Sequence, residues 1–263
     1  MSRTLIIATW SGDRHWHHPK QESDRGYYVR QQVKQLEMLR HSITDIVFVV
    51  PYNEEEPPSF KRAIESLNDK IVNTRVCVLR RENAGMSYGS WLHAMRKITK
   101  SNWYFLLEDD YIFTQNEFDD RLIEMITDRP KCGYLCGKIQ KYRNVNENLV
   151  GKESRSIIAS VSCGLVHGRA ARKIVKYLSH LDWVTKRALS RNNCLSQIAF
   201  SALFNGDGRH RRWRAPPWKI KDVRDQYSVV FRNYDGTTDR FHGQQPIIMA
   251  PIGGESCIDS PCE

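Results

Sequence analysis

Three features are missing from this 263-residue sequence, and each absence excludes a class of protein. No run approaches the roughly 20 apolar residues that a membrane helix needs, and the opening MSRTLIIATWSGDR has too short an apolar run for a secretory signal. The seven cysteines are odd in number and form no C-x-x-C pair, so neither a disulfide framework nor a zinc ribbon is indicated. We therefore expect a soluble, cytoplasmic protein with free thiols and no membrane insertion.

Acidic residues are fewer than basic ones. The sequence has 30 Asp and Glu and 40 Lys and Arg, which gives a formal net charge of +10. This excess favours anionic partners such as phosphates or nucleic acid. The charge alone does not choose among them. The composition does not indicate an oligomeric state.

Strand-like and helix-like patterns alternate through the first two thirds of the chain. Residues 4–10 and 45–51 are continuous apolar runs of the kind expected in strands buried on both faces of a parallel sheet. Between them Val29, Val33 and Leu36 mark one helix face. Further strands are predicted over 75–80, 103–108, 132–139 and 156–166, with helices between and after them. The pattern predicts a mainly parallel α/β sheet flanked by helices.

The character of the sequence changes near residue 205, where stretches rich in Gly, Pro, Arg and Trp replace the periodic pattern. We expect a single Rossmann-like core over residues 1–204. Residues 205–263 are expected to form an irregular basic C-terminal segment that completes the site.

An acidic cluster, Glu108, Asp109 and Asp110, directly follows the predicted strand WYFLLE. Ligands of open parallel sheets bind beyond the carboxyl ends of the strands, and adjacent carboxylates suit Mg²⁺ or Mn²⁺ bound to substrate phosphates. Two structural alternatives are a solvated acidic turn and a charge cluster before the helix that begins near Phe118.

Four motifs occur in the order found in nucleotide-sugar glycosyltransferases of the GT-A fold, and the chain resembles that family over residues 4–204. They are ATWSGD, RRENAGMSYG, LLEDD and SVSCGLVHGRAARKI. The resemblance implies a metal-dependent hexosyl- or pentosyltransferase that uses a nucleotide-diphosphate sugar, with a UDP-sugar favoured.

The resemblance also implies roles for individual residues. Asp110 would be the direct ligand of Mn²⁺ or Mg²⁺. Asp109 would belong to the same metal site and face the donor, and His242 would be a further metal ligand. Glu108 would face the donor. The other donor-binding residues implied are Thr9, Trp10, Ser11, Asn83 and Gly85. Asn83 and Gly85 could equally form an ordinary turn that caps the next helix.

Asp182 is the candidate general base, a role that the resemblance implies for an inverting enzyme and that would be lost in a retaining one. A loop aspartate at the end of a helix is the alternative interpretation.

Basic and aromatic residues alternate in the C-terminal segment and could bind the acceptor: Arg211, Arg212, Trp213 and Trp218. Indole faces stack on sugar rings or bases, and arginines neutralise phosphates. A glycan acceptor is favoured over DNA that carries a hydroxylated base. The alternative is a surface loop whose tryptophans pack onto the sheet.

Two other functions stay open, namely nucleotidyl transfer to a sugar phosphate and non-catalytic binding of nucleic acid.

Overall fold

The computed structural model describes the larger part of the chain up to residue 177 and shorter pieces after it. These are residues 1–12, 24–52, 56–69, 74–129, 131–142 and 156–177, parts of 197–204, and the short strands 219–222, 229–232, 238–241 and 249–251. Among these residues, no helix is long and apolar enough to cross a membrane.

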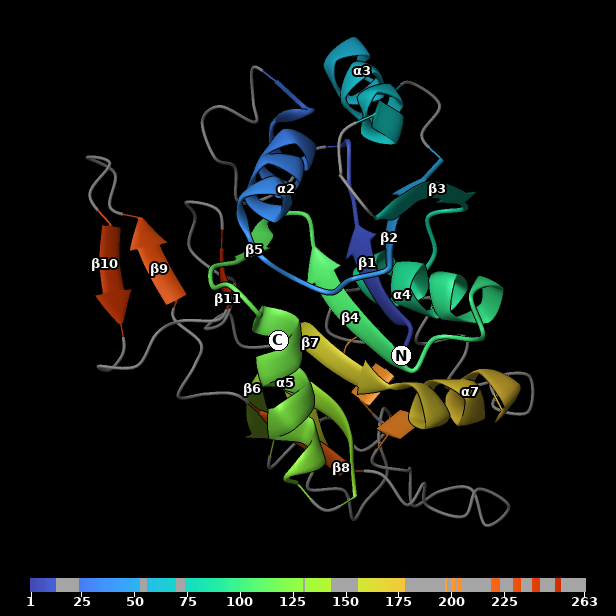
Figure 1. Cartoon of the computed structure of the whole chain (residues 1–263), viewed down its shortest axis with the longest axis vertical. Coiled ribbons are helices and arrows are strands. Elements are labelled where there is room, and N and C mark those ends of the chain that lie inside the picture. The colour runs from blue at the N-terminus through green and yellow to red at the C-terminus, as the bar shows by residue number, and fades with distance from the viewer. Residues whose placement is uncertain are drawn as a thin grey trace.

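Strands and helices alternate along the chain (Figure 1). The main sheet contains β1 (Arg3–Ala8), β2 (Asp45–Pro51), β3 (Arg75–Arg81), β4 (Trp103–Glu108), β6 (Cys132–Tyr142), β7 (Ser156–His167) and β8 (Lys219–Asp222). The helices are α2 (Tyr27–Met38), α3 (Pro58–Glu65) followed by the 3₁₀ turn η1 (Ser66–Asp69), α4 (Met86–Lys97), α5 (Phe118–Thr127) and α7 (Gly168–Tyr177). Four short strands lie outside the main sheet: β5 (Tyr111–Phe113), β9 (Val229–Arg232), β10 (Thr238–Phe241) and β11 (Met249–Pro251).

The seven strands are arranged in the order β3-β2-β1-β4-β7-β6-β8. The neighbours β3, β2, β1 and β4 run parallel, β7 is antiparallel to both β4 and β6, and β8 is parallel to β6. The predicted α/β class with a mainly parallel sheet is therefore confirmed, and β7 is the antiparallel member within the described part of the sheet.

Helices cover both faces of this sheet, and β1 shows how the sequence achieves it. Leu5 and Ile7 pack with the apolar residues of α2, α3 and α5, whereas Ile6 and Ala8 pack with those of α4 and α7. Because successive strand residues point to opposite faces, the continuous apolar runs fill two separate cores. The fold has three layers, with the sheet in the middle.

The predicted helix face of Val29, Val33 and Leu36 lies on α2, and all three residues are buried. Three further apolar residues, Leu39, Leu67 and Ile98, lie just beyond the ends of α2, α3 and α4. All three still pack against a core. An apolar residue can thus continue the spacing of a helix face after the backbone has left the helix.

Two C-terminal strands join the rest of the molecule. Strand β8 pairs with β6, and β11 pairs with β5 so that Pro251 lies opposite Tyr111. Since Tyr111 directly follows Asp110, part of the C-terminal segment lies next to the acidic cluster.

Candidate functional site

The acidic cluster lies at the point where the order of strands reverses. Strands β2 and β3 lie on one side of β1, and β4 lies on the other. The last residue of β4, Glu108, is in register with Ala8, the last residue of β1. Ligands of open parallel sheets bind at this kind of crevice, because loops leave in opposite directions from neighbouring strand ends.

Asp109 connects the loops that follow β1 and β4. Its side chain is only 2% exposed. Its backbone N–H donates to the carbonyl of Ala8 at 3.0 Å, and its Oδ2 accepts a hydrogen bond from the backbone N–H of Trp10 at 2.9 Å. The buried carboxylate therefore fixes the position of the loop after β1 relative to residues 108–110, the acidic cluster, which we call the acidic turn from here on.

Glu108 and Asp110 are partly exposed and lie close to the buried Cys163 of β7. The backbone N–H of Glu108 donates to Cys163 Sγ at 3.4 Å. Burial raises the pKa of the Cys163 thiol well above its usual range, and the charges of Glu108 and Asp110 raise it further. The thiol thus stays protonated and adds no negative charge beneath the two carboxylates.

The side chain of Gln32, in α2, donates hydrogen bonds to the backbone of the acidic turn and of the residue after it. Its side chain is 1% exposed, and its Nε2 donates to the backbone carbonyl of Asp109 at 2.9 Å and to that of Tyr111. The carbonyl of Glu108 lies at 3.4 Å from the same nitrogen. One buried amide therefore satisfies carbonyls on both sides of Asp110.

The three residues after β1 differ in exposure. Thr9 is buried, and its N–H and Oγ1 both donate to the carbonyl of Val49, at 3.1 and 2.9 Å. Ser11 is also buried, whereas Trp10 is partly exposed. Thr9 therefore anchors the loop to β2. Trp10 is the most accessible of the three proposed donor-binding residues.

The loop after β3 is folded around the guanidinium group of Arg81. This side chain is 6% exposed and donates to the carbonyls of Glu82, Ala84 and Met86, each at 2.6 Å, and to Ser90 Oγ at 3.1 Å. Burial lowers the pKa of Arg81 to about 10, so the group remains charged at neutral pH. The hydrogen bonds fix the path of the loop that carries the predicted donor residues.

Asn83 and Gly85 lie in this loop at the same edge of the sheet as the acidic turn. Gly85 is the N-cap of α4, with φ of 77°, in the left-handed region that favours glycine. No side chain caps the helix by a hydrogen bond, so Asn83 does not cap α4. A Cβ on Gly89 would lie 1.9 Å from the carbonyl oxygen of Ala84. Glycine at position 89 therefore allows the loop after β3 to pack directly against α4.

The donor atoms at this edge fit a divalent cation that is bound together with substrate phosphates. Magnesium and manganese sites of this kind use one or two carboxylates and take their other oxygens from phosphates and water. Asp109 and Asp110 are adjacent carboxylates at the carboxyl end of β4. In the described part of the chain, no group of three or more His, Cys, Asp or Glu residues could hold a metal by itself. A cation held by these two carboxylates would take its remaining ligands from substrate phosphates and water.

Six predicted site residues lie outside the described residues: Asp182, His242, Arg211, Arg212, Trp213 and Trp218. The structure does bring together the loops that carry Thr9, Trp10, Ser11, Glu108, Asp109 and Asp110, and it places Asn83 and Gly85 at the end of β3, two strands from β1.

Sequence reasoning missed Gln32, Arg81 and Cys163, and the first of them left a readable signal. Gln32 is a polar residue on the apolar face formed by Val29, Val33 and Leu36, where an amide needs buried partners. Neither Arg81, in a basic run, nor Cys163, in a buried strand, differs visibly from its surroundings in the sequence.

A scan against protein-family models finds no match, and no curated protein matches the sequence. Solved structures do match. The apo form of mouse xyloside xylosyltransferase 1 matches with a TM-score of 0.52 and 10% identity, over 95% of this chain and 97% of that chain. The galactosyltransferase LgtC, in complex with donor and acceptor sugar analogs, matches with a TM-score of 0.53 and 11% identity, over 99% of this chain and 88% of that chain. At these identities the likeness shows the fold.

Proposed function

We propose that this chain, which has the GT-A fold of nucleotide-sugar glycosyltransferases, transfers a sugar from a nucleotide-diphosphate sugar to a hydroxyl group. A UDP-sugar is the favoured donor and a glycan the favoured acceptor. The enzyme would be a hexosyl- or pentosyltransferase that depends on Mn²⁺ or Mg²⁺.

One observation carries the proposal, namely the position of the acidic turn. Residues 108–110 lie at the reversal of strand order, and the Asp109 carboxylate binds the loop that would meet the nucleoside. A solvated surface turn does not require a buried glutamine and a buried carboxylate to fix its backbone. Gln32 and Asp109 supply such groups.

Individual residues of the site would have the following roles. Asp110 and Asp109 would hold the divalent cation, which stabilises the negative charge that develops on the departing diphosphate. Trp10, the most exposed of residues 9–11, would contact the nucleobase. Arg81 would keep the loop that carries Asn83 and Gly85 in place beside the donor. Glu108 would face the sugar.

The acceptor side would be completed by the C-terminal segment. We retain a core formed mainly by residues 1–204 and a completing segment of residues 205–263. This segment adds β8 to the edge of the main sheet beside β6, and its strand β11 pairs with β5 next to Asp110. Arg211, Arg212, Trp213 and Trp218 would bind the acceptor, His242 would add a metal ligand, and Asp182 would act as base if the reaction inverts configuration.

DNA that carries a hydroxylated base is the second candidate acceptor. The net charge of +10 favours it, because a glycan without charged groups makes no use of such an excess. A panel of glycan acceptors and of duplexes with and without hydroxymethylated bases separates the two candidates.

The test is a turnover assay of Asp110→Asn with a panel of UDP-, GDP-, dTDP- and CMP-sugars and manganese. Donors that bind are first found by thermal shift, because a ligand of the native state raises apparent stability. We expect nucleotide release by the wild type to require manganese and to be lost in Asp110→Asn. The matched control is Asp128→Asn, an exposed carboxylate that follows α5. Wild-type protein that turns over no nucleotide sugar would refute the proposal.

A further inference from the structure

A stripe of positive charge runs along the exposed side of α7. Its members, spaced as neighbours on one helix face, are Arg169, Arg172, Lys173 and Lys176. The opposite side of the helix, with Ala170, Ala171 and Ile174, is buried in the core. The stripe is thus the side of the helix that meets solvent.

The end of α4 extends this surface. Helices α4 and α7 pack beside each other on the same side of the sheet (Figure 1). Arg172 Nη1 donates to the carbonyl of Ser101 at 3.1 Å, which ties the stripe to the loop that follows α4. Exposed basic residues of α4 and this loop are Arg96, Lys97 and Lys100. Together with the four residues of α7 they form what we call the basic face.

Acidic residues are absent from the segments that form this surface. Residues 83–107 and 156–177 contain no Asp or Glu. Among the described residues, no ion pair joins any member of the basic face to a carboxylate, whereas Lys61 of α3 has Glu65 one turn away at 3.9 Å. The positive charges are therefore not balanced from within these two segments.

This arrangement is unfavourable for the helix on its own. Arg169 and Lys173, and likewise Arg172 and Lys176, are like charges at i,i+4 spacing, each pair costing roughly 0.2–0.5 kcal/mol. Arg169 also lies in the first turn, where the helix dipole disfavours cations, and that turn contains no acidic residue. An anionic partner would turn each of these costs into an attraction.

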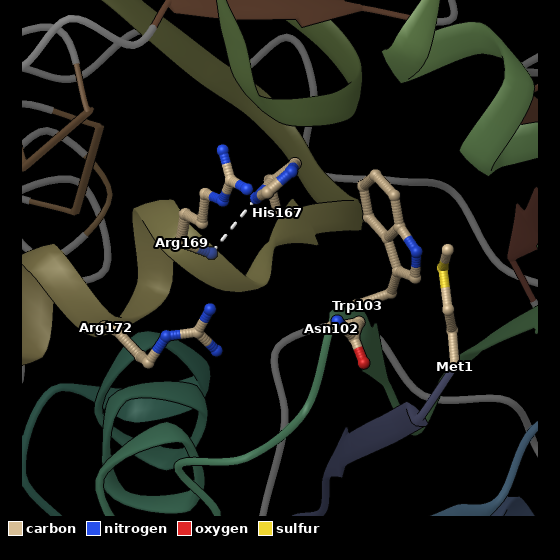
Figure 2. Close-up of a pocket in the computed structure, with 6 residues that line it drawn as sticks. All are labelled: Met1, Asn102, Trp103, His167, Arg169 and Arg172. Atoms are coloured by element: carbon tan, nitrogen blue, oxygen red, sulfur yellow. Dashed lines mark hydrogen bonds between the residues drawn. The ribbon is translucent and has the colours of Figure 1, made fainter.

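A cavity of about 280 Å³ opens beside the stripe at the amino ends of β1 and β4. Figure 2 shows Arg169 and Arg172 on one side of it and Trp103 and Met1 on the other. His167 Nδ1 accepts a hydrogen bond from the N–H of Arg169 at 3.0 Å, and its ring meets Trp103 edge to face at 4.7 Å. Trp103 begins β4 and Glu108 ends it, so the cavity lies at the opposite edge of the sheet from the acidic turn.

We propose that the basic face binds the sugar-phosphate backbone of a nucleic acid. The cavity lined by Trp103 and His167 would lie beside the bound backbone. Residues 169 to 176 span about 10 Å of helix, which corresponds to about three phosphates along one strand. A membrane surface fits less well, because interfacial helices insert an apolar side, and the apolar side of α7 is buried against the sheet. The proposal is independent of sugar transfer, since no member of the basic face belongs to the acidic turn.

The experiment measures binding of a fluorescently labelled DNA duplex by anisotropy over a series of NaCl concentrations. The variant is the triple substitution Arg169→Glu, Lys173→Glu and Lys176→Glu. The control reverses three exposed basic residues of α2 and α3 on the other side of the sheet, Lys34→Glu, Lys61→Glu and Arg62→Glu, and changes the net charge equally. A second variant with Gln at positions 169, 173 and 176 removes charge without adding any, and its melting temperature checks the fold.

We expect the wild type and the control to bind the duplex with a steep salt dependence. The glutamate variant should lose at least about tenfold in affinity at low salt, and its slope should fall by about 0.9 for each phosphate that it no longer neutralises. The glutamine variant should show an intermediate loss at an unchanged or higher melting temperature. Equal affinity and slope for variant and control would overturn the proposal. So would binding to phosphatidylserine vesicles without binding to the duplex.

Discussion

Replacing Gln32 by Met removes the amide that holds the acidic turn while keeping nearly the same side-chain length. In the structure Nε2 of Gln32 donates to the buried carbonyls of Asp109, at 2.9 Å, and Tyr111. A buried polar group that loses its partner costs about 1–3 kcal/mol. With two carbonyls affected and some relaxation of the turn, we expect the free energy of unfolding to fall by about 2–4 kcal/mol.

Urea unfolding at neutral pH measures this change, and the midpoint should move while the slope m stays the same. Gln31→Met is the matched control, because Gln31 is a half-exposed neighbour on the same helix and should change stability by less than about 0.5 kcal/mol. In Gln32→Met the donor KM should also rise, because the turn loses its support. A Gln32→Met protein as stable as the control would show that the amide does not hold the turn.

Two further predictions concern the loop after β3 and the response to acid. Gly89→Ala should lower the free energy of unfolding by about 1–3 kcal/mol, because the new Cβ would lie 1.9 Å from the Ala84 carbonyl oxygen; urea unfolding with Ser87→Ala as control measures it, and an unchanged midpoint would contradict it. Burial lowers the pKa of His93 and His167, aided by neighbouring cations. The unfolded chain therefore binds more protons below about pH 6.5, and stability should fall as the pH drops from about 7 to 5.5. Substituting both histidines by Gln should flatten this decline, and an equally steep decline would refute it.

The sheet was predictable because its strands are buried on both faces. Residues 46–51 are apolar at every position and buried on both faces of the sheet, and such a run can be recognised without any contact information. The structure places β2 at Asp45–Pro51, the predicted range. The short strand β5, by contrast, forms by pairing with β11. The paired residues Ile112 and Ala250 are 138 positions apart in the sequence. Pairing over that distance leaves no local pattern.

The position of the acidic cluster at the end of a strand was predictable, because its chemistry concentrates in a few adjacent residues. Glu108, Asp109 and Asp110 stand out because three carboxylates follow an apolar strand. Their residue types alone do not distinguish them, and the separate roles given to them above come from the family resemblance. Burial and the hydrogen bond to Trp10 separate Asp109 from its neighbours, and both arise from tertiary packing. The support from Gln32 is equally invisible locally, because its partners lie 77 and 79 residues away.

The most direct test of the account is a crystal grown or soaked with Mn²⁺ and a UDP-sugar, with the anomalous signal of manganese used to locate the ion. The account predicts a manganese peak within coordinating distance of the Asp110 carboxylate and of the donor diphosphate, at the edge where β1 and β4 end. A donor bound at this edge without manganese, or a manganese peak away from residues 108–110, would contradict it.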